Sequence, residues 1–171
     1  MSVPVPPAPD GGAVVHPRAA EVVALLTRRG ETVACAESLT GGLVCAALTS
    51  VPGASVVVAG GVVAYTIAAK RDVLGVPADV LRAHGAVAEP TAVAMAAAAR
   101  RLFGATWGVA TTGVAGPDPS EGKPVGTVHV AVAGEETHLP RALSLHGSRS
   151  DIRAATVGQA VEALYRLLAG E

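Results

Sequence analysis

The chain has 171 residues, of which 50% are hydrophobic and only 2% aromatic, with a formal net charge of −1 at pH 7. A charge this close to zero creates no global field that would attract nucleic acid or an anionic membrane surface, so neither is expected as a partner. No apolar run has the roughly 18 to 20 residues of a membrane span, and no signal-like segment is visible, so we expect one soluble, cytoplasmic domain.

The predicted elements begin after residues 1–16, whose four prolines and two glycines indicate a disordered tail, and the folded domain is expected over 17–171. Apolar periodicity, proline at a helix start and glycine at a helix end define the elements that follow. Helices are predicted over 17–29, 38–49, 68–74, 78–83, 90–103 and 151–169. Strands are predicted over 32–36, 56–65 (interrupted by two glycines), 106–111, 125–133 and 139–145.

Strands alternate with helices through most of this pattern, and the last two strands form a plausible hairpin. Such alternation is typical of α/β proteins, while the hairpin adds antiparallel pairing to the sheet. The sequence therefore predicts a single-domain, three-layer α/β/α sandwich with a mixed sheet.

Ser38 follows a predicted strand and precedes Thr40-Gly41-Gly42, so its hydroxyl is expected at the N-terminus of a helix. Free N–H groups and the helix dipole stabilise an oxyanion or a phosphate at such a place. A serine can also simply cap the helix, and the sequence leaves both roles open. The neighbouring Glu37 is either a surface group or a hydrogen-bonding group of the pocket.

Only two lysines, Lys70 and Lys123, stand beside eleven arginines, and this bias makes Lys70 informative. Arginine stays protonated, whereas lysine can act as a base once burial or a nearby charge lowers its pKa. Tyr65 ends an apolar strand, so we expect a packed ring and a hydroxyl at the edge of the sheet where ligands bind. A Ser38–Lys70 pair for acyl transfer is the favoured interpretation, and a solvated lysine is the alternative.

A glycine-rich loop and an arginine pair are candidate sites for an anionic group. Residues 111–118 read Thr-Thr-Gly-Val-Ala-Gly-Pro-Asp, a structural turn or a loop that lets the backbone approach a ligand. Its spacing is not that of a Walker A motif. Arg149 and Arg153, near the start of the last helix, could hold a phosphate or could lie at the surface.

Metal-binding patterns are missing from the sequence. The five histidines lack ligand spacing, no Cys-x-x-Cys occurs, and Cys35 and Cys45 are interpreted as small buried thiols. Neither Ser-x-x-Lys nor Gly-x-Ser-x-Gly occurs around Ser38. We therefore expect no metal and no cofactor.

These stretches resemble the CinA C-terminal domain family over roughly residues 17–169. The matching blocks are A-E-S-L-T-G-G at 36–42, L-T-S-V-P-G-A-S at 48–55, G-G-V-V-A-Y-T with its following lysine at 60–70, L-G-V at 74–76, H-G-A-V at 84–87, T-G-V-A-G-P-D at 112–118, K-P-V-G-T-V at 123–128 and the two arginines of 149–153. The characterised activity of that family is nicotinamide-nucleotide amidohydrolase, also called NMN deamidase. The resemblance implies Ser38 as nucleophile, Lys70 as base, Tyr65 close by, and no metal.

Two positions depart from the family pattern. Ile67 stands where the family usually has asparagine, which would leave the pocket one polar contact poorer. Ser148 stands where the family usually has an aspartate, which would remove a carboxylate that could orient Arg149.

The residues and the resemblance together predict hydrolysis of the carboxamide of nicotinamide mononucleotide (NMN), giving nicotinate mononucleotide and ammonia. Backbone N–H groups of residues 40–42 are expected to hold the oxyanion, and a homo-oligomer, with a dimer favoured, is expected. Two alternatives are a nucleotide-binding or regulatory module with little turnover, and a Ser-Lys enzyme for another amide or ester. The expected catalytic residues are Ser38, Lys70 and Tyr65, and the expected substrate-binding residues are Glu37, Thr40, Gly41, Gly42, Thr112, Gly113, Ala115, Gly116 and Arg149.

Overall fold

The computed structural model describes residues 16–171, so the predicted disordered tail lies outside the described residues except for His16. Five strands form one sheet in the order β2-β1-β3-β4-β5. The strands β1 (Val33–Glu37), β2 (Val58–Val63) and β3 (Trp107–Gly113) are parallel. The strands β4 (Thr127–Ala133) and β5 (His138–Ser144) add an antiparallel pair. The predicted mixed sheet and hairpin are confirmed.

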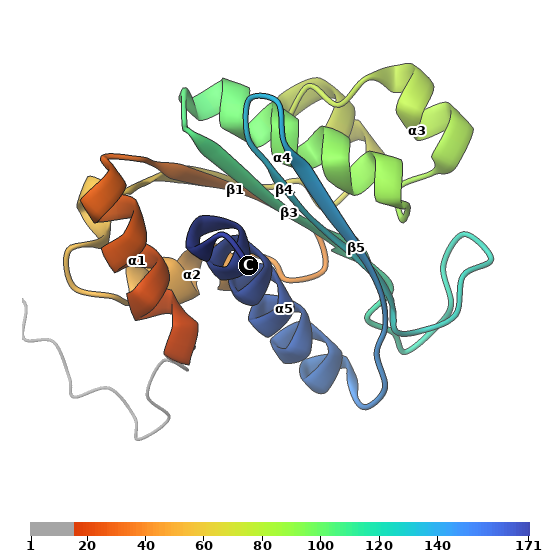
Figure 1. Ribbon diagram of the computed structural model, residues 1–171. Coiled ribbons are helices and arrows are strands. Elements are labelled where there is room, and N and C mark those ends of the chain that lie inside the picture. Colours follow the sequence, from red (N-terminus) through yellow and green to blue (C-terminus); the bar gives the residue numbers. More distant parts are fainter. Residues whose placement is uncertain (1–15) are drawn as a thin grey trace, which may run out of the picture.

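Helices cover both faces of the sheet and complete the predicted three layers (Figure 1). One face carries α1 (Pro17–Arg29), α2 (Leu43–Thr49) and α5 (Arg149–Ala169). The other face carries α3 (Ala78–His84) and α4 (Glu89–Phe103). In residues 16–171, no helix combines the length and the apolar character that a membrane crossing requires.

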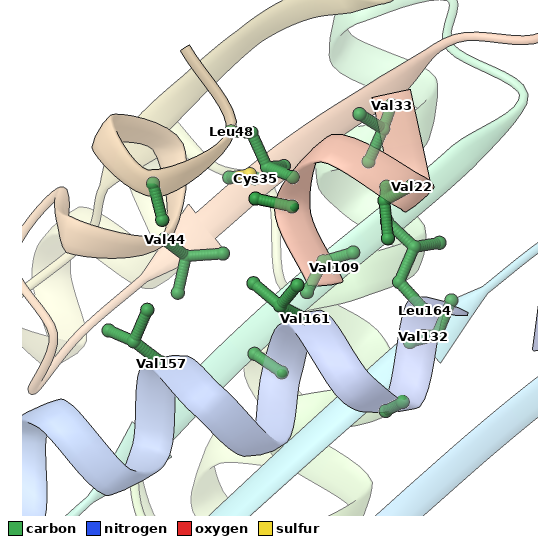
Figure 2. Packing of buried hydrophobic residues seen from close by; sticks show 14 of the residues in the cluster. Val22, Val33, Cys35, Val44, Leu48, Val109, Val132, Val157, Val161 and Leu164 are labelled. Carbon is green, nitrogen blue, oxygen red and sulfur yellow. The ribbon is translucent and has the colours of Figure 1, made fainter. Parts of the chain in front are cut away.

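The two faces of the sheet are filled by side chains of different size, because successive strand residues point to opposite faces. Valines and Cys35 form the core beneath α1, α2 and α5, as Figure 2 shows for Val33, Val109 and Val132. The face beneath α4 is made of alanines (Ala34, Ala36, Ala110, Ala131 and Ala133). This second core of small side chains explains how the chain folds with so few aromatic residues.

The alanine face lets α4 lie unusually close to the sheet. A Cβ atom added to Gly108 of β3 would lie 1.9 Å from the carbonyl oxygen of Ala96 in α4. Likewise, Gly60 of β2 accommodates the ring of Phe103, since an added Cβ would lie 2.3 Å from that ring. The glycine pair inside the predicted second strand therefore serves packing and does not end the strand.

Several predicted boundaries differ from the structure, and three of these differences concern residues near the candidate site. The helix expected from Ser38 begins only at Leu43, because Gly41 and Gly42 adopt φ values of +60° and +101°, which lie outside the right-handed helical region. The strand expected to reach Tyr65 ends at Val63. The helix expected over 68–74 is a single π-helical turn, Ala69–Val73.

Candidate active site

A cavity of about 230 Å³ lies at the edge of the sheet where the three parallel strands end. Ser38 follows β1 directly, Tyr65 comes two residues after β2, and Gly113 is the last residue of β3. All three line the cavity, together with Lys70 and Arg149. Carboxyl ends of parallel strands are the usual ligand site of open α/β sheets, so the topology brings together residues that are far apart in the sequence.

Ser38 and Lys70 are in direct contact at the floor of this cavity. The Lys70 ammonium donates to Ser38 Oγ at 3.0 Å and to the carbonyl oxygen of Ala64 at 2.8 Å. Ser38 is 8% exposed and Lys70 only 1% exposed, so the solvated-lysine alternative is wrong. The short π-helical turn carries the lysine inward beneath the end of β2.

Burial of the Lys70 side chain lowers its pKa from 10.5 to about 8, because an ammonium is poorly solvated in the interior. The carboxylate of Glu121 opposes this effect and raises the pKa of Lys70. A lysine with a pKa near 8 is neutral in a useful fraction of molecules at physiological pH. It can therefore accept a proton, as a general base must.

Glu121 lines the cavity and was not singled out from the sequence. Its carboxylate accepts from the N–H groups of Ala86 (2.9 Å) and Val87 (3.2 Å) and pairs with Lys123 at 3.4 Å. Partial burial alone would raise the pKa of Glu121, but these donors outweigh it and lower the pKa. No motif or periodicity marks this residue, because its role arises from contacts with a loop 34 and 35 positions away in the chain.

Glu37 has a role that the sequence did not predict. The carboxylate is 2% exposed and accepts from the N–H groups of Gly42 (2.9 Å), Val44 (3.1 Å) and Cys45 (2.8 Å). It thus caps the N-terminus of α2, which favours negative charge. The Glu37 carboxylate lies at the N-terminus of α2 and does not line the cavity. The expectation that Glu37 binds the substrate is therefore corrected.

The turn after Ser38 also differs from expectation. The N–H of Gly41 donates to the carbonyl oxygen of Ser38 at 3.1 Å, and the N–H of Gly42 donates to Glu37. Neither group is free to hold an oxyanion. Within residues 16–171, the N–H groups of Leu39 and Thr40 donate to no protein acceptor. Leu39 lines the cavity, whereas Thr40 is fully buried and its hydroxyl pairs with Thr111 at 2.6 Å.

The glycine-rich loop forms one wall of the cavity with Thr112, Gly113, Ala115 and Gly116. The Thr112 hydroxyl donates to the carbonyl oxygen of Ala86 at 2.7 Å and so joins two walls of the cavity. A Cβ atom at Gly113 would lie 2.7 Å from the Thr127 carbonyl oxygen, so this glycine accommodates the neighbouring strand rather than a ligand.

Tyr65 and Arg149 form the mouth of the cavity. The Arg149 guanidinium donates to the Tyr65 hydroxyl at 2.8 Å and to the Gly116 carbonyl oxygen at 2.7 Å. Tyr65 is 55% exposed, so the expectation of a packed ring is wrong. These two bonds orient Arg149 without a carboxylate.

The remaining predicted positions lie away from the cavity. Ile67 is 49% exposed and does not line the cavity. Ser148 caps α5 in a reciprocal arrangement with Asp151. Arg153 binds the carbonyl oxygens of Leu39 and Thr40 instead of facing the cavity beside Arg149. Across residues 16–171, no three metal-ligating side chains are grouped.

Comparison with known proteins gives a consistent result along nearly the whole chain. The family model described as the CinA C-terminal domain matches residues 15–168. The chain belongs to the CinA C-terminal domain family. The resemblance noted in the sequence is thereby confirmed.

Curated members of the CinA family include close relatives of this chain. A CinA-like protein of Frankia casuarinae is 50% identical over 87% of this chain, and one of Anaeromyxobacter sp. (strain K) is 54% identical over 84% of it. The matched regions are 34% and 35% of those two proteins, so the chain spans about a third of their length.

Solved CinA structures have the same fold. The competence/damage inducible protein CihA from Agrobacterium tumefaciens is 40% identical, with a TM-score of 0.85 and coverage of 98% of this chain and 99% of that one. A CinA superfamily protein from Klebsiella pneumoniae is 34% identical, with a TM-score of 0.87 and coverage of 92% and 99%.

Proposed function

We propose that this CinA-family protein is a metal-independent amidohydrolase that converts NMN to nicotinate mononucleotide and ammonia. The observation that carries the proposal is the buried Lys70, whose Nζ lies 3.0 Å from Ser38 Oγ at the floor of an open cavity. A serine beside a lysine of lowered pKa is a known solution for activating a hydroxyl nucleophile. The resemblance to NMN deamidases supplies the substrate.

The chemistry begins with neutral Lys70, which takes the proton of the Ser38 hydroxyl as Oγ attacks the amide carbon. The Ala64 carbonyl oxygen accepts a hydrogen bond from Lys70 Nζ. This bond orients the lone pair of Nζ toward Ser38 Oγ. The protonated Lys70 then gives its proton to the leaving nitrogen, and ammonia departs. Water then gives a proton to Lys70 and attacks the acyl-serine, and Lys70 returns that proton to Ser38 Oγ as it leaves, which releases the carboxylic acid.

The charge that develops on the amide oxygen requires a hydrogen-bond donor near Ser38. The Leu39 N–H suits this role because it follows the nucleophile directly, is unpaired in residues 16–171, and belongs to a residue that lines the cavity. A donor of this kind typically contributes about 3–4 kcal/mol to the transition state.

Arg149 is the proposed phosphate-binding group. A guanidinium has five N–H donors, and the bonds to Tyr65 and Gly116 leave others for a ligand at the cavity mouth. Tyr65 holds Arg149 in place, while the loop of residues 112–116 forms the wall along which the nucleotide would lie.

The direct test is ammonia release from NMN by the purified protein, with the appearance of nicotinate mononucleotide followed by chromatography. Ser38→Ala is the matched inactive control. Tight NMN binding without ammonia release would favour the nucleotide-binding module. Turnover of other amides or esters, but not of NMN, would retain the Ser-Lys chemistry and reject this substrate.

A further inference from the structure

Arg153 occupies an unusual position for a half-buried arginine. Its Nε donates to the Leu39 carbonyl oxygen at 2.9 Å, and its Nη2 donates to the Thr40 carbonyl oxygen at 3.0 Å. Within residues 16–171 it forms no ion pair with a carboxylate. The Nε–Nη2 edge of the guanidinium is therefore directed at the two residues that follow the nucleophile.

These contacts fix the orientation of the Leu39 N–H. The peptide unit before Leu39 is held by the bond from the Gly41 N–H to the Ser38 carbonyl oxygen at 3.1 Å. The peptide unit after Leu39 is held by Arg153. Because peptide units are planar and rigid, anchoring the units on both sides of one Cα leaves its N–H no freedom to rotate.

The charge of Arg153 acts on the same turn. A cation bonded to a carbonyl oxygen polarises the peptide and strengthens the N–H of that peptide as a donor. The peptide that contains the Leu39 carbonyl also contains the unpaired Thr40 N–H. Because Thr40 is fully buried, its N–H does not reach the cavity, and Leu39 is the residue of this turn that lines it.

We infer that Arg153 is the positioning residue for the Leu39 N–H, the proposed oxyanion donor, acting through the Leu39 and Thr40 carbonyl oxygens and touching neither substrate nor nucleophile. The inference rests on the proposed function. It assigns the two arginines at the start of α5 to different tasks, with Arg149 for recognition at the mouth and Arg153 for the geometry of the turn. Loss of Arg153 should therefore lower kcat and leave KM almost unchanged.

The experiment compares Arg153→Met and Arg153→Lys with Arg29→Met. Arg29 provides a matched control because its guanidinium also donates to a backbone carbonyl oxygen of α5, that of Leu168, far from the nucleophile turn. We expect Arg153→Met to reduce kcat for NMN by about 10²-fold, the size of effect for one oxyanion donor. Arg153→Lys should recover part of the loss, since one ammonium can hold one of the two carbonyls. Arg29→Met should lower the melting temperature and leave kcat unchanged.

A second readout is independent of the substrate. A fluorophosphonate is attacked at phosphorus by Ser38 Oγ with loss of fluoride, and its phosphoryl oxygen takes the oxyanion position. We expect Arg153→Met to slow this labelling by about 10²-fold as well, measured as the mass gain on Ser38. If Arg153→Met does not fold, Arg153→Lys provides the same comparison with a smaller effect.

The outcomes separate the two proposals. The wild type could label quickly at Ser38 but release no ammonia from NMN. In that case, slow labelling of the Arg153 variants would support the role of Arg153 and reject the substrate. Wild-type kcat and labelling rates in both Arg153 variants would overturn the inference and leave the amidohydrolase proposal intact. A rise in KM alone would assign Arg153 to binding and also overturn it. A wild type that neither labels at Ser38 nor releases ammonia would overturn both.

Discussion

The floor and the mouth of the cavity differ in solvent exposure, and therefore in the charge of their basic side chains. At the floor, Lys70 is 1% exposed, and burial lowers its pKa to about 8. At the mouth, Tyr65 is 55% exposed, and its partner Arg149 is also exposed. A buried amine becomes a base, whereas an exposed guanidinium keeps its charge for recognition. Changes at the floor should therefore affect kcat, and changes at the mouth should affect KM.

The largest effect is expected for Ser38→Ala, which removes the proposed nucleophile at the floor. Loss of a catalytic serine lowers kcat by about 10⁴- to 10⁶-fold in comparable hydrolases. The measurement is ammonia release from NMN, with circular dichroism to confirm an intact fold. Ser144→Ala, on the far edge strand β5, is the matched control and should keep full activity. Substantial turnover by Ser38→Ala would rule out a covalent mechanism.

Lys70→Arg should be nearly as damaging as Lys70→Ala, because arginine keeps the charge but cannot supply a neutral base. Both should lower kcat by about 10³-fold or more. Arg71→Ala, which alters an exposed neighbour paired with Asp72, is the control for local effects. An active Lys70→Arg variant would mean that Lys70 acts as a cation and not as a base. The floor would then carry a permanent positive charge, as Arg149 does at the mouth.

At the mouth, Arg149→Ala should reduce kcat/KM for NMN by about 10²-fold, mainly through KM. Each charge-assisted contact contributes about 1.5–3 kcal/mol, and 1.36 kcal/mol corresponds to a tenfold change. Nicotinamide riboside, which lacks the phosphate, should be hydrolysed about 10²-fold less efficiently than NMN by the wild type. The hydrolysis of nicotinamide riboside should be almost unaffected by Arg149→Ala. Equal sensitivity of the two compounds would show that Arg149 does not bind phosphate.

A smaller effect is expected from pH. Since only neutral Lys70 accepts a proton, kcat/KM should rise with pH through a midpoint near 8. The Glu121 carboxylate raises the pKa of Lys70, so Glu121→Gln should lower it and move the rise to lower pH. Asp118→Asn removes a different carboxylate of the same cavity and should leave the midpoint in place. A shift to higher pH in Glu121→Gln would contradict the proposed electrostatics.

The smallest effect is expected from chelation. In residues 16–171 no group of three metal-ligating side chains exists, so activity should survive prolonged treatment with EDTA. The measurement is kcat for NMN before and after dialysis against the chelator. A loss restored by zinc or magnesium would mean that the floor uses metal chemistry in place of Lys70.

The sequence by itself determined the layered α/β architecture and the chemically distinctive residues. Alternating short segments of helix and strand predicted a mixed sheet between two helical layers, whereas the strand order β2-β1-β3-β4-β5 came only from the structure. Lys70 stood out because the chain uses arginine almost everywhere else, and Ser38 because a strand, a serine and two glycines follow one another. Both features come from composition and residue order, so no knowledge of distant contacts was needed.

Only the tertiary structure decided what the neighbouring polar residues do. Glu37 caps α2 because Gly41 and Gly42 take left-handed conformations and delay the helix to Leu43, a backbone choice that the sequence pattern does not reveal. Glu121 reaches the 86–87 loop, and Arg153 reaches the turn of residues 39–40 across more than 110 positions of the chain. Such contacts depend on how the sheet brings strand ends together, so they cannot be read from periodicity or spacing.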